Sequence, residues 1–127
     1  MAKYLLIQNY EGGTCTIPMG EWDPADVRAH IEFQIGLDRE LTGAGELVDS
    51  QGVAGPEQAK RVTSDGGPPA VVTGPFGPAP LLAGYRLVDV GSEDRAVEIA
   101  ARASAAPGPG GTAMEIPIEV RQIMGAP

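Results

Sequence analysis

The sequence predicts an α+β fold in which one antiparallel sheet carries two helices on one face. Short apolar runs alternate with Gly- and Pro-rich segments, and two longer segments place apolar residues at helical spacing. Their order along the chain is β-α-β-β-(β)-α-β, the split βαβ pattern of ferredoxin-like domains. A chain of 127 residues has room for one core, so we expect a single domain over residues 1–127.

The first elements are a strand and a long helix. Residues 4–8 form a short apolar run that is typical of a buried central strand. Asp23 suits the N-cap of the helix, Pro24 suits its first position, and residues 42–45 end it with two glycines. Val27, Ile31 and Ile35 form an i, i+4, i+8 series, which predicts a buried helical face. The apolar positions are Val27, Ile31, Phe33, Ile35, Leu37 and Leu41.

The middle of the chain predicts a hairpin. Residues 46–49 indicate a brief strand or a bend, and residues 59–64 alternate loosely, as a strand does. A Gly- and Pro-rich turn at residues 65–69 precedes a returning strand at residues 70–73. We therefore expect two paired strands that end in Gly74-Pro75-Phe76.

The last third predicts a strand, a helix and a strand. Residues 84–90 form a β-run, and Ser92 is the expected N-cap of the second helix. The residues expected on the buried side of this helix are Ala96, Val97, Ile99, Ala100 and Ala103. Residues 114–123 form the final β-run. Pro117 interrupts this run, which indicates either a bulge or an edge strand, because proline lacks a backbone donor.

Charge and cysteine content exclude several classes of protein. The formal net charge is −8 and the nine Lys and Arg residues are scattered, so we expect no nucleic-acid binding and no binding to anionic membranes. The single Cys15 cannot form an internal disulfide. No apolar run is long enough for a signal sequence or a membrane span, so the expected location is the cytoplasm.

Several short motifs in a fixed order resemble the YCII-related family, in particular its DGPF branch. These motifs are Lys3–Ile7, Ala44–Leu47, Gly74-Pro75-Phe76, Gly84-Tyr85, Ala96–Ala100 and Ile118–Arg121. The resemblance implies a ferredoxin-like domain that pairs into a dimeric α/β barrel, hence a homodimer. Strand 4–8 independently favours a partner subunit, because apolar side chains alternate onto both of its faces.

The resemblance implies two classes of function. Relatives of the DGPF type are linked with extracytoplasmic-function sigma factors, which implies a non-catalytic or regulatory domain with a protein partner. The alternative is a small enzyme, without a cofactor, that acts on a small organic acid or phenolic molecule in the barrel cavity. In some relatives a His and an Asp near the first helix are the suggested active site; His30 lies about one turn too early to match that His.

Five residues are candidates for a ligand site. Thr73 stands where the branch usually has Asp, and a rigid turn ending in Phe76 suits the mouth of a cavity. Arg86 and Arg121 are a potential clamp for a carboxylate or phosphate, unless Glu119 and Asp89 neutralise them. His30 is the only histidine and a potential acid or base.

Each candidate has a simpler interpretation. Phe76 would plug the core behind an ordinary turn. His30 would be an exposed or core-edge side chain: Asp26 lies four residues before it, whereas Glu32, two residues after it, lies on a different side of the helix. Cys15 has no neighbouring base, and one His with one Cys predicts no metal site. A polar cavity with Arg86 or Arg121 pointing inward would favour ligand binding or catalysis, whereas a cavity filled by Leu and Phe76 would favour a scaffold.

Overall fold

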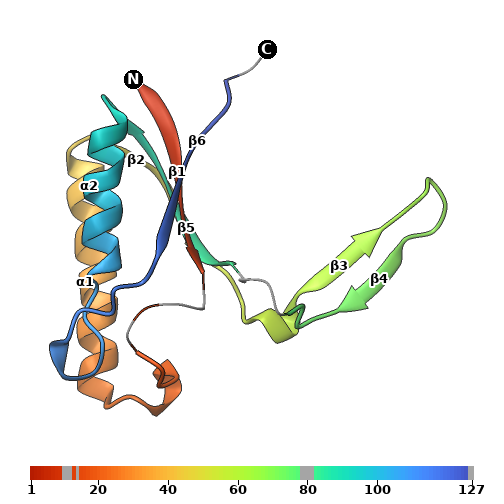
Figure 1. Cartoon of the computed structure of the whole chain (residues 1–127), viewed down its shortest axis with the longest axis horizontal. Helices are drawn as coiled ribbons and strands as arrows, with labels where there is room; N and C mark the ends of the chain where they lie inside the picture. The colour runs from red at the N-terminus through yellow and green to blue at the C-terminus, as the bar shows by residue number, and fades with distance from the viewer. Residues whose placement is uncertain (10–12, 14, 78–81, 126–127) are drawn as a thin grey trace.

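A four-stranded antiparallel sheet with two helices on one face forms the body of the molecule (Figure 1). The computed structural model describes residues 1–9, 13, 15–77 and 82–125. The sheet has the order β2-β5-β1-β6 and is compatible with a ferredoxin-like fold. Its strands are β1 (Ala2–Asn9), β2 (Leu47–Gly52), β5 (Leu82–Val90) and β6 (Ile118–Gln122). The helices are α1 (Pro24–Gly43) and α2 (Glu93–Ser104), with single 3-10 turns at Met19–Glu21, Pro56–Gln58 and Pro109–Gly111.

Strand alternation places the core on the helix side of the sheet. Tyr4 lies opposite Val88 in the β1–β5 ladder, and both side chains are buried beneath the helices. Leu5 and Leu87, one residue along, face the other side and are half-buried. Both faces of β1 therefore carry apolar side chains, as predicted, although only one face is covered by this chain.

The buried stripe of α1 differs from the predicted one. Asp23 is the N-cap as expected, and its Oδ1 accepts from the Ala25 amide at 3.0 Å. Ile31 and Ile35 are nevertheless 48% and 52% exposed, so the prediction that they line a buried face was wrong. The buried positions of α1 are His30, Leu37 and Leu41.

Arg86 on the facing strand gives the physical reason for this rotation of α1. Its side chain is only 9% exposed, and a buried guanidinium needs hydrogen-bond acceptors. The stripe that contains Gln34 and Asp38 supplies those acceptors, whereas the Ile31–Ile35 stripe has none to offer.

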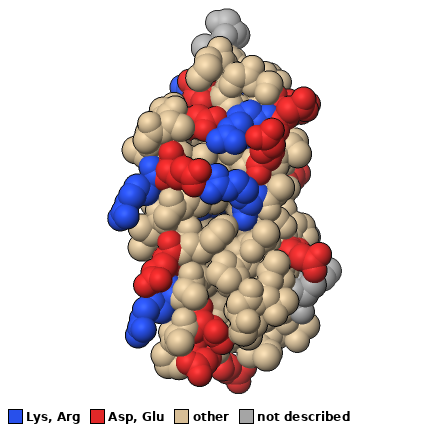
Figure 2. Space-filling view, turned by 90° about the vertical axis from the view of Figure 1, so that its left-hand side faces the viewer, with Lys and Arg blue, Asp and Glu red and all other residues tan. Residues whose placement is uncertain are grey.

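The second helix packs closely through small side chains. Ser92 is its N-cap, and the Ser92 hydroxyl accepts from the Arg95 amide at 3.1 Å. Its buried residues are Ala96, Ile99, Ala100 and Ala103, whereas Val97 is 51% exposed, so the prediction that Val97 is buried was wrong. On the outer side of the helices, acidic and basic side chains lie next to one another (Figure 2). The pairs Arg102–Glu40 and Arg95–Glu46 join α2 to α1 and to the segment that follows α1.

The predicted hairpin is confirmed, and it projects away from the body (Figure 1). It consists of β3 (Lys60–Thr63) and β4 (Ala70–Thr73), which form a separate two-stranded sheet among the described residues, and all eight strand residues are exposed. Phe76 follows β4 and packs under the Arg61 guanidinium, 4.1 Å from the ring centroid. Because Phe76 lies outside the core cluster, the interpretation that it plugs the core is wrong for the single subunit.

The final strand is an edge strand. Among the described strands, β6 pairs with β1 alone, and it begins at Ile118, directly after Pro117. Proline therefore precedes the ladder and removes none of its hydrogen bonds, which resolves the two predicted alternatives in favour of an edge position. Among the described residues, no helix combines the length and the hydropathy needed to cross a bilayer.

Candidate functional site

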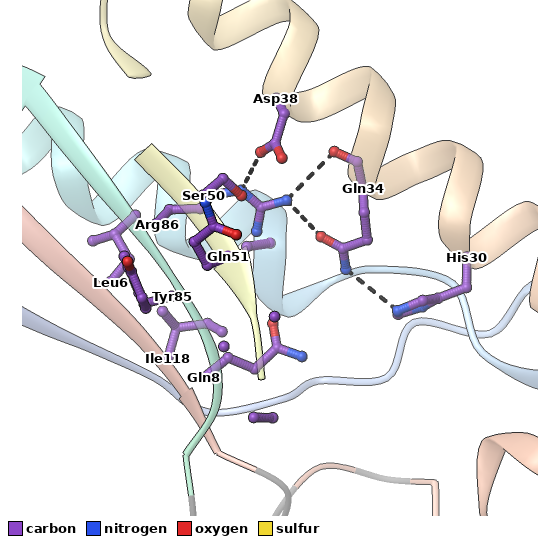
Figure 3. Close-up of a pocket in the computed structure, with 14 residues that line it drawn as sticks. Leu6, Gln8, His30, Gln34, Asp38, Ser50, Gln51, Tyr85, Arg86 and Ile118 are labelled. Carbon is purple, nitrogen blue, oxygen red and sulfur yellow. Dashed lines mark hydrogen bonds and ion pairs between the residues drawn. The ribbon is translucent and has the colours of Figure 1, made fainter. Parts of the chain in front are cut away.

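A polar pocket of about 310 Å³ lies between α1 and the helix-facing side of the sheet (Figure 3). Polar side chains from α1, β1, β2 and β5 meet apolar ones from β1, α2 and β6 in its wall. The lining residues are Leu6, Gln8, His30, Gln34, Asp38, Ser50, Gln51, Gly52, Ala83, Gly84, Tyr85, Arg86, Ala103 and Ile118. The pocket is therefore an amphipathic site within one subunit, and it lies on the covered side of the sheet.

Arg86 anchors the polar wall. It faces the helices because it occupies the same side of β5 as the core residues Val88 and Val90. Its Nε donates to Asp38 Oδ1 at 2.7 Å, and its Nη2 donates to Gln34 Oε1 at 2.5 Å. Nη2 also donates to the Gln34 backbone carbonyl at 3.5 Å. Three oxygens of α1 thus hold the guanidinium, and Asp38 neutralises its charge.

His30 lies at the other end of this polar wall. The side chain is 7% exposed, its Nδ1 lies 3.0 Å from the Pro107 carbonyl oxygen, and its Nε2 lies 3.4 Å from Gln34 Nε2. The Trp22 ring meets the imidazole edge to face, with the centroids 5.7 Å apart. A continuous series of hydrogen bonds therefore runs from Asp38 through Arg86 and Gln34 to His30 (Figure 3).

Two of the five predicted site residues meet in this pocket. His30 and Arg86 both line it, although the acidic partner of Arg86 is Asp38 and neither Asp89 nor Glu119. Arg121 lies opposite Leu5 in the β1–β6 ladder, so it is exposed on the other face of the sheet. Thr73 and Phe76 belong to the hairpin, where Thr73 Oγ1 accepts from Lys60 Nζ at 3.0 Å.

Sequence reasoning missed Gln34 and Asp38. The signal was present, because His30, Gln34 and Asp38 stand four residues apart and share one helical stripe. The missing link was Arg86, whose bonds to Gln34 and Asp38 require the fold to bring β5 against α1.

The aromatic Tyr85 connects the pocket rim to the outer face of the sheet. Its hydroxyl donates to Asp49 Oδ2 at 2.8 Å. This bond, with a further one from Gln51, holds the pKa of the Asp49 carboxyl below its usual value. The same bond raises the pKa of the Tyr85 hydroxyl, because the carboxylate accepts a hydrogen bond from the protonated phenol and its negative charge opposes loss of the proton.

The other reactive groups form no comparable site. Cys15 lies in a separate hollow with Ile17, Pro109 and Thr112, and its thiol donates to the Ile17 carbonyl at 3.6 Å. No titratable base lines that hollow in the described part of the chain. The described residues also contain no cluster of three His, Cys, Asp or Glu side chains that would hold a metal ion.

Comparison with known proteins adds no further assignment. No family model matches the chain, and no curated protein is significantly similar to it. The geometry of the pocket is therefore the basis for assigning a function.

Proposed function

We propose that this chain is a small-molecule-binding domain whose pocket accepts a small organic acid or phenolic molecule and offers His30 as an acid or base. The observation that supports this most directly is the polar pocket with Arg86 directed into it and connected to His30. A scaffold with no ligand would gain more from an apolar filling, because a buried cation and a buried imidazole both require compensating partners.

The shape of the pocket favours a small aromatic or aliphatic ligand. A volume of about 310 Å³ is at the small end of ligand sites in proteins. Leu6, Ala103 and Ile118 supply apolar contacts on one side, while Arg86 and His30 supply polar contacts on the other. A ligand with an apolar body and one or two oxygen groups satisfies both sides. Its hydroxyl group would face His30, which is then placed to take up the proton.

Three related probes test this proposal. Phenol, benzoate and 4-hydroxybenzoate carry the same ring with a hydroxyl group, a carboxylate or both. We expect amide chemical-shift changes in ¹H–¹⁵N spectra to concentrate on the pocket-lining residues of α1, β2 and β5. Ser50→Leu, which fills the pocket, should abolish these changes, whereas Thr63→Leu on the projecting hairpin should preserve them. The absence of pocket shifts with all three probes would contradict the proposal.

The projecting hairpin supports a second, compatible role as an interaction domain. Val62, Val71 and Val72 are each more than half exposed, and a free two-stranded hairpin is only marginally stable in water. The uncovered sheet face adds Leu5 and Leu87, and the Oδ1 atom of Asp89 is buried there without a partner among the described residues. We propose that a second copy covers these surfaces, so that the pocket operates within a homodimer. A regulatory protein partner would bind through the same exposed valines.

A further inference from the structure

The donor and acceptor of each hydrogen bond in the pocket follow from Arg86, which donates both to Asp38 and to Gln34. A guanidinium only donates, so the Gln34 atom that receives Arg86 Nη2 at 2.5 Å is the amide oxygen. The amide nitrogen of Gln34 therefore faces His30 Nε2, and because that nitrogen donates, Nε2 must accept. The orientation of the amide thus follows from Arg86 and needs no assumption about His30.

The other side of the imidazole gives the same assignment independently. His30 Nδ1 lies 3.0 Å from the Pro107 carbonyl oxygen, which only accepts. Nδ1 must therefore carry the hydrogen atom. Both neighbours select the neutral ring with hydrogen on Nδ1 and a lone pair on Nε2.

Arg86 and Asp38 have a positioning role in this arrangement. Asp38 Oδ1 holds Arg86 Nε at 2.7 Å, which fixes the guanidinium plane, and Nη2 then fixes the Gln34 amide. The bond from Gln34 to His30 is long, at 3.4 Å, compared with about 3 Å for a strong bond. A ligand hydroxyl at ordinary distance would therefore displace Gln34 from Nε2 readily.

We infer that Asp38, Arg86 and Gln34 act as positioning residues that keep His30 Nε2 as a hydrogen-bond acceptor, so that the pocket selects ligands by a hydroxyl donor. This inference rests on the proposed function and makes it more specific. The charge of Arg86 is already neutralised by Asp38, so the site distinguishes phenols and hydroxy compounds from simple anions. Phenol should accordingly bind more tightly than benzoate.

The single histidine makes this inference directly measurable. A long-range ¹H–¹⁵N spectrum of the full-length ¹⁵N-labelled protein at neutral pH contains only one imidazole pattern. We expect Nδ1 to have the ¹⁵N chemical shift of a protonated ring nitrogen and Nε2 to have that of an unprotonated one. The opposite tautomer, or an average of the two, would overturn the inference.

Variants at position 34 test the positioning role. Gln34→Glu replaces the donor beside Nε2 with a carboxylate, so both ring nitrogens should become protonated and phenol binding should weaken about tenfold, the effect of losing one hydrogen bond. Gln34→Met removes the whole amide, both the donor to Nε2 and the acceptor of Arg86 Nη2, and should weaken the preference for the Nδ1-protonated ring, which the Pro107 carbonyl would then support alone. Glu32→Gln, on an exposed part of α1, is the matched control and should leave the pattern unchanged.

The outcomes separate this inference from the proposed function. The expected tautomer without binding of any probe would refute the proposed function while leaving the positioning role intact. Binding of phenol with the opposite tautomer would support the proposed function and refute the inference. Arg86→Met is a further test, because a purely structural arginine would lower stability without changing the tautomer in the fraction that folds.

Discussion

At the scale of single residues, buried polar groups decide which side chains act together. His30 and Arg86 are both 7% exposed, and each has a partner in the described residues. Asp38 is less buried, with a side chain 31% exposed, and among the described residues it is the only acidic group paired with Arg86. The pocket therefore combines a rigid, satisfied polar wall with a partly open rim.

Replacement of Asp38 by Asn should destabilise the protein by about 2 kcal/mol, because the buried Arg86 would lose its counter-charge. Urea denaturation of the two proteins measures this difference. Glu32→Gln, an acid-to-amide change on an exposed part of the same helix, should change the free energy of unfolding by much less. If both variants changed the free energy of unfolding equally, the Arg86–Asp38 pair would make no specific contribution to stability.

The Tyr85–Asp49 bond should make stability depend on pH at both ends of the range. The pKa of Asp49 is lowered in the folded state, so its contribution is present above about pH 4 and is lost as pH falls through the lowered value. The pKa of Tyr85 is raised, so its contribution is present below about pH 10 and is lost as pH rises through the raised value. In Tyr85→Phe, both dependences should become weaker. Thermal melts from pH 3 to pH 11 would test this, and unchanged profiles would argue against the bond.

At the scale of elements, α1 combines a polar stripe with an apolar one. The stripe of His30, Gln34 and Asp38 faces the sheet, whereas Ile31 and Ile35 remain exposed. Helical periodicity alone does not distinguish two adjacent stripes on a helix that carries apolar residues on more than one side. For the hairpin, the turn residues correctly predicted its formation, whereas its projection from the body is seen only in the tertiary structure (Figure 1).

Gly36 provides a test of the exposed side of α1. A Cβ atom at this helical position would meet nothing within 4 Å, so Gly36→Ala should stabilise the protein by about 1 kcal/mol. Gly45→Ala is the contrasting variant, because Gly45 follows the helix with φ of +74° and alanine is strained there. Calorimetric melts should therefore move in opposite directions. A loss of stability in Gly36→Ala would instead indicate close approach of another chain at this position.

At the scale of the whole molecule, one subunit leaves two surfaces uncovered. The helices lie on one face of the sheet, and the hairpin projects from the body (Figure 1). The other face of the sheet carries half-buried leucines, and the hairpin carries exposed valines. Burial of such surfaces in an interface would add apolar contacts that one subunit does not make. These surfaces are the physical basis for the proposed homodimer.

Light scattering at micromolar concentration should give the mass of a dimer. Val62→Lys combined with Val72→Lys should shift the mass towards that of a monomer if the hairpin contributes to the interface. Val97→Lys, at a valine 51% exposed on α2, should leave the mass unchanged. A monomer mass for the unmodified protein would contradict the proposed homodimer.

The sequence by itself determined the local structure of this protein. Alternating apolar runs, the caps Asp23 and Ser92, and the turn at residues 65–69 predicted the elements and their order, because these signals depend on neighbours within one or two turns. The tertiary structure decided the rest. It selected the buried stripe of α1 and joined His30 to Asp38 through Arg86, which lies 48 residues from Asp38 along the chain. That contact arises because a buried guanidinium must find acceptors across the core, a requirement that no local pattern encodes.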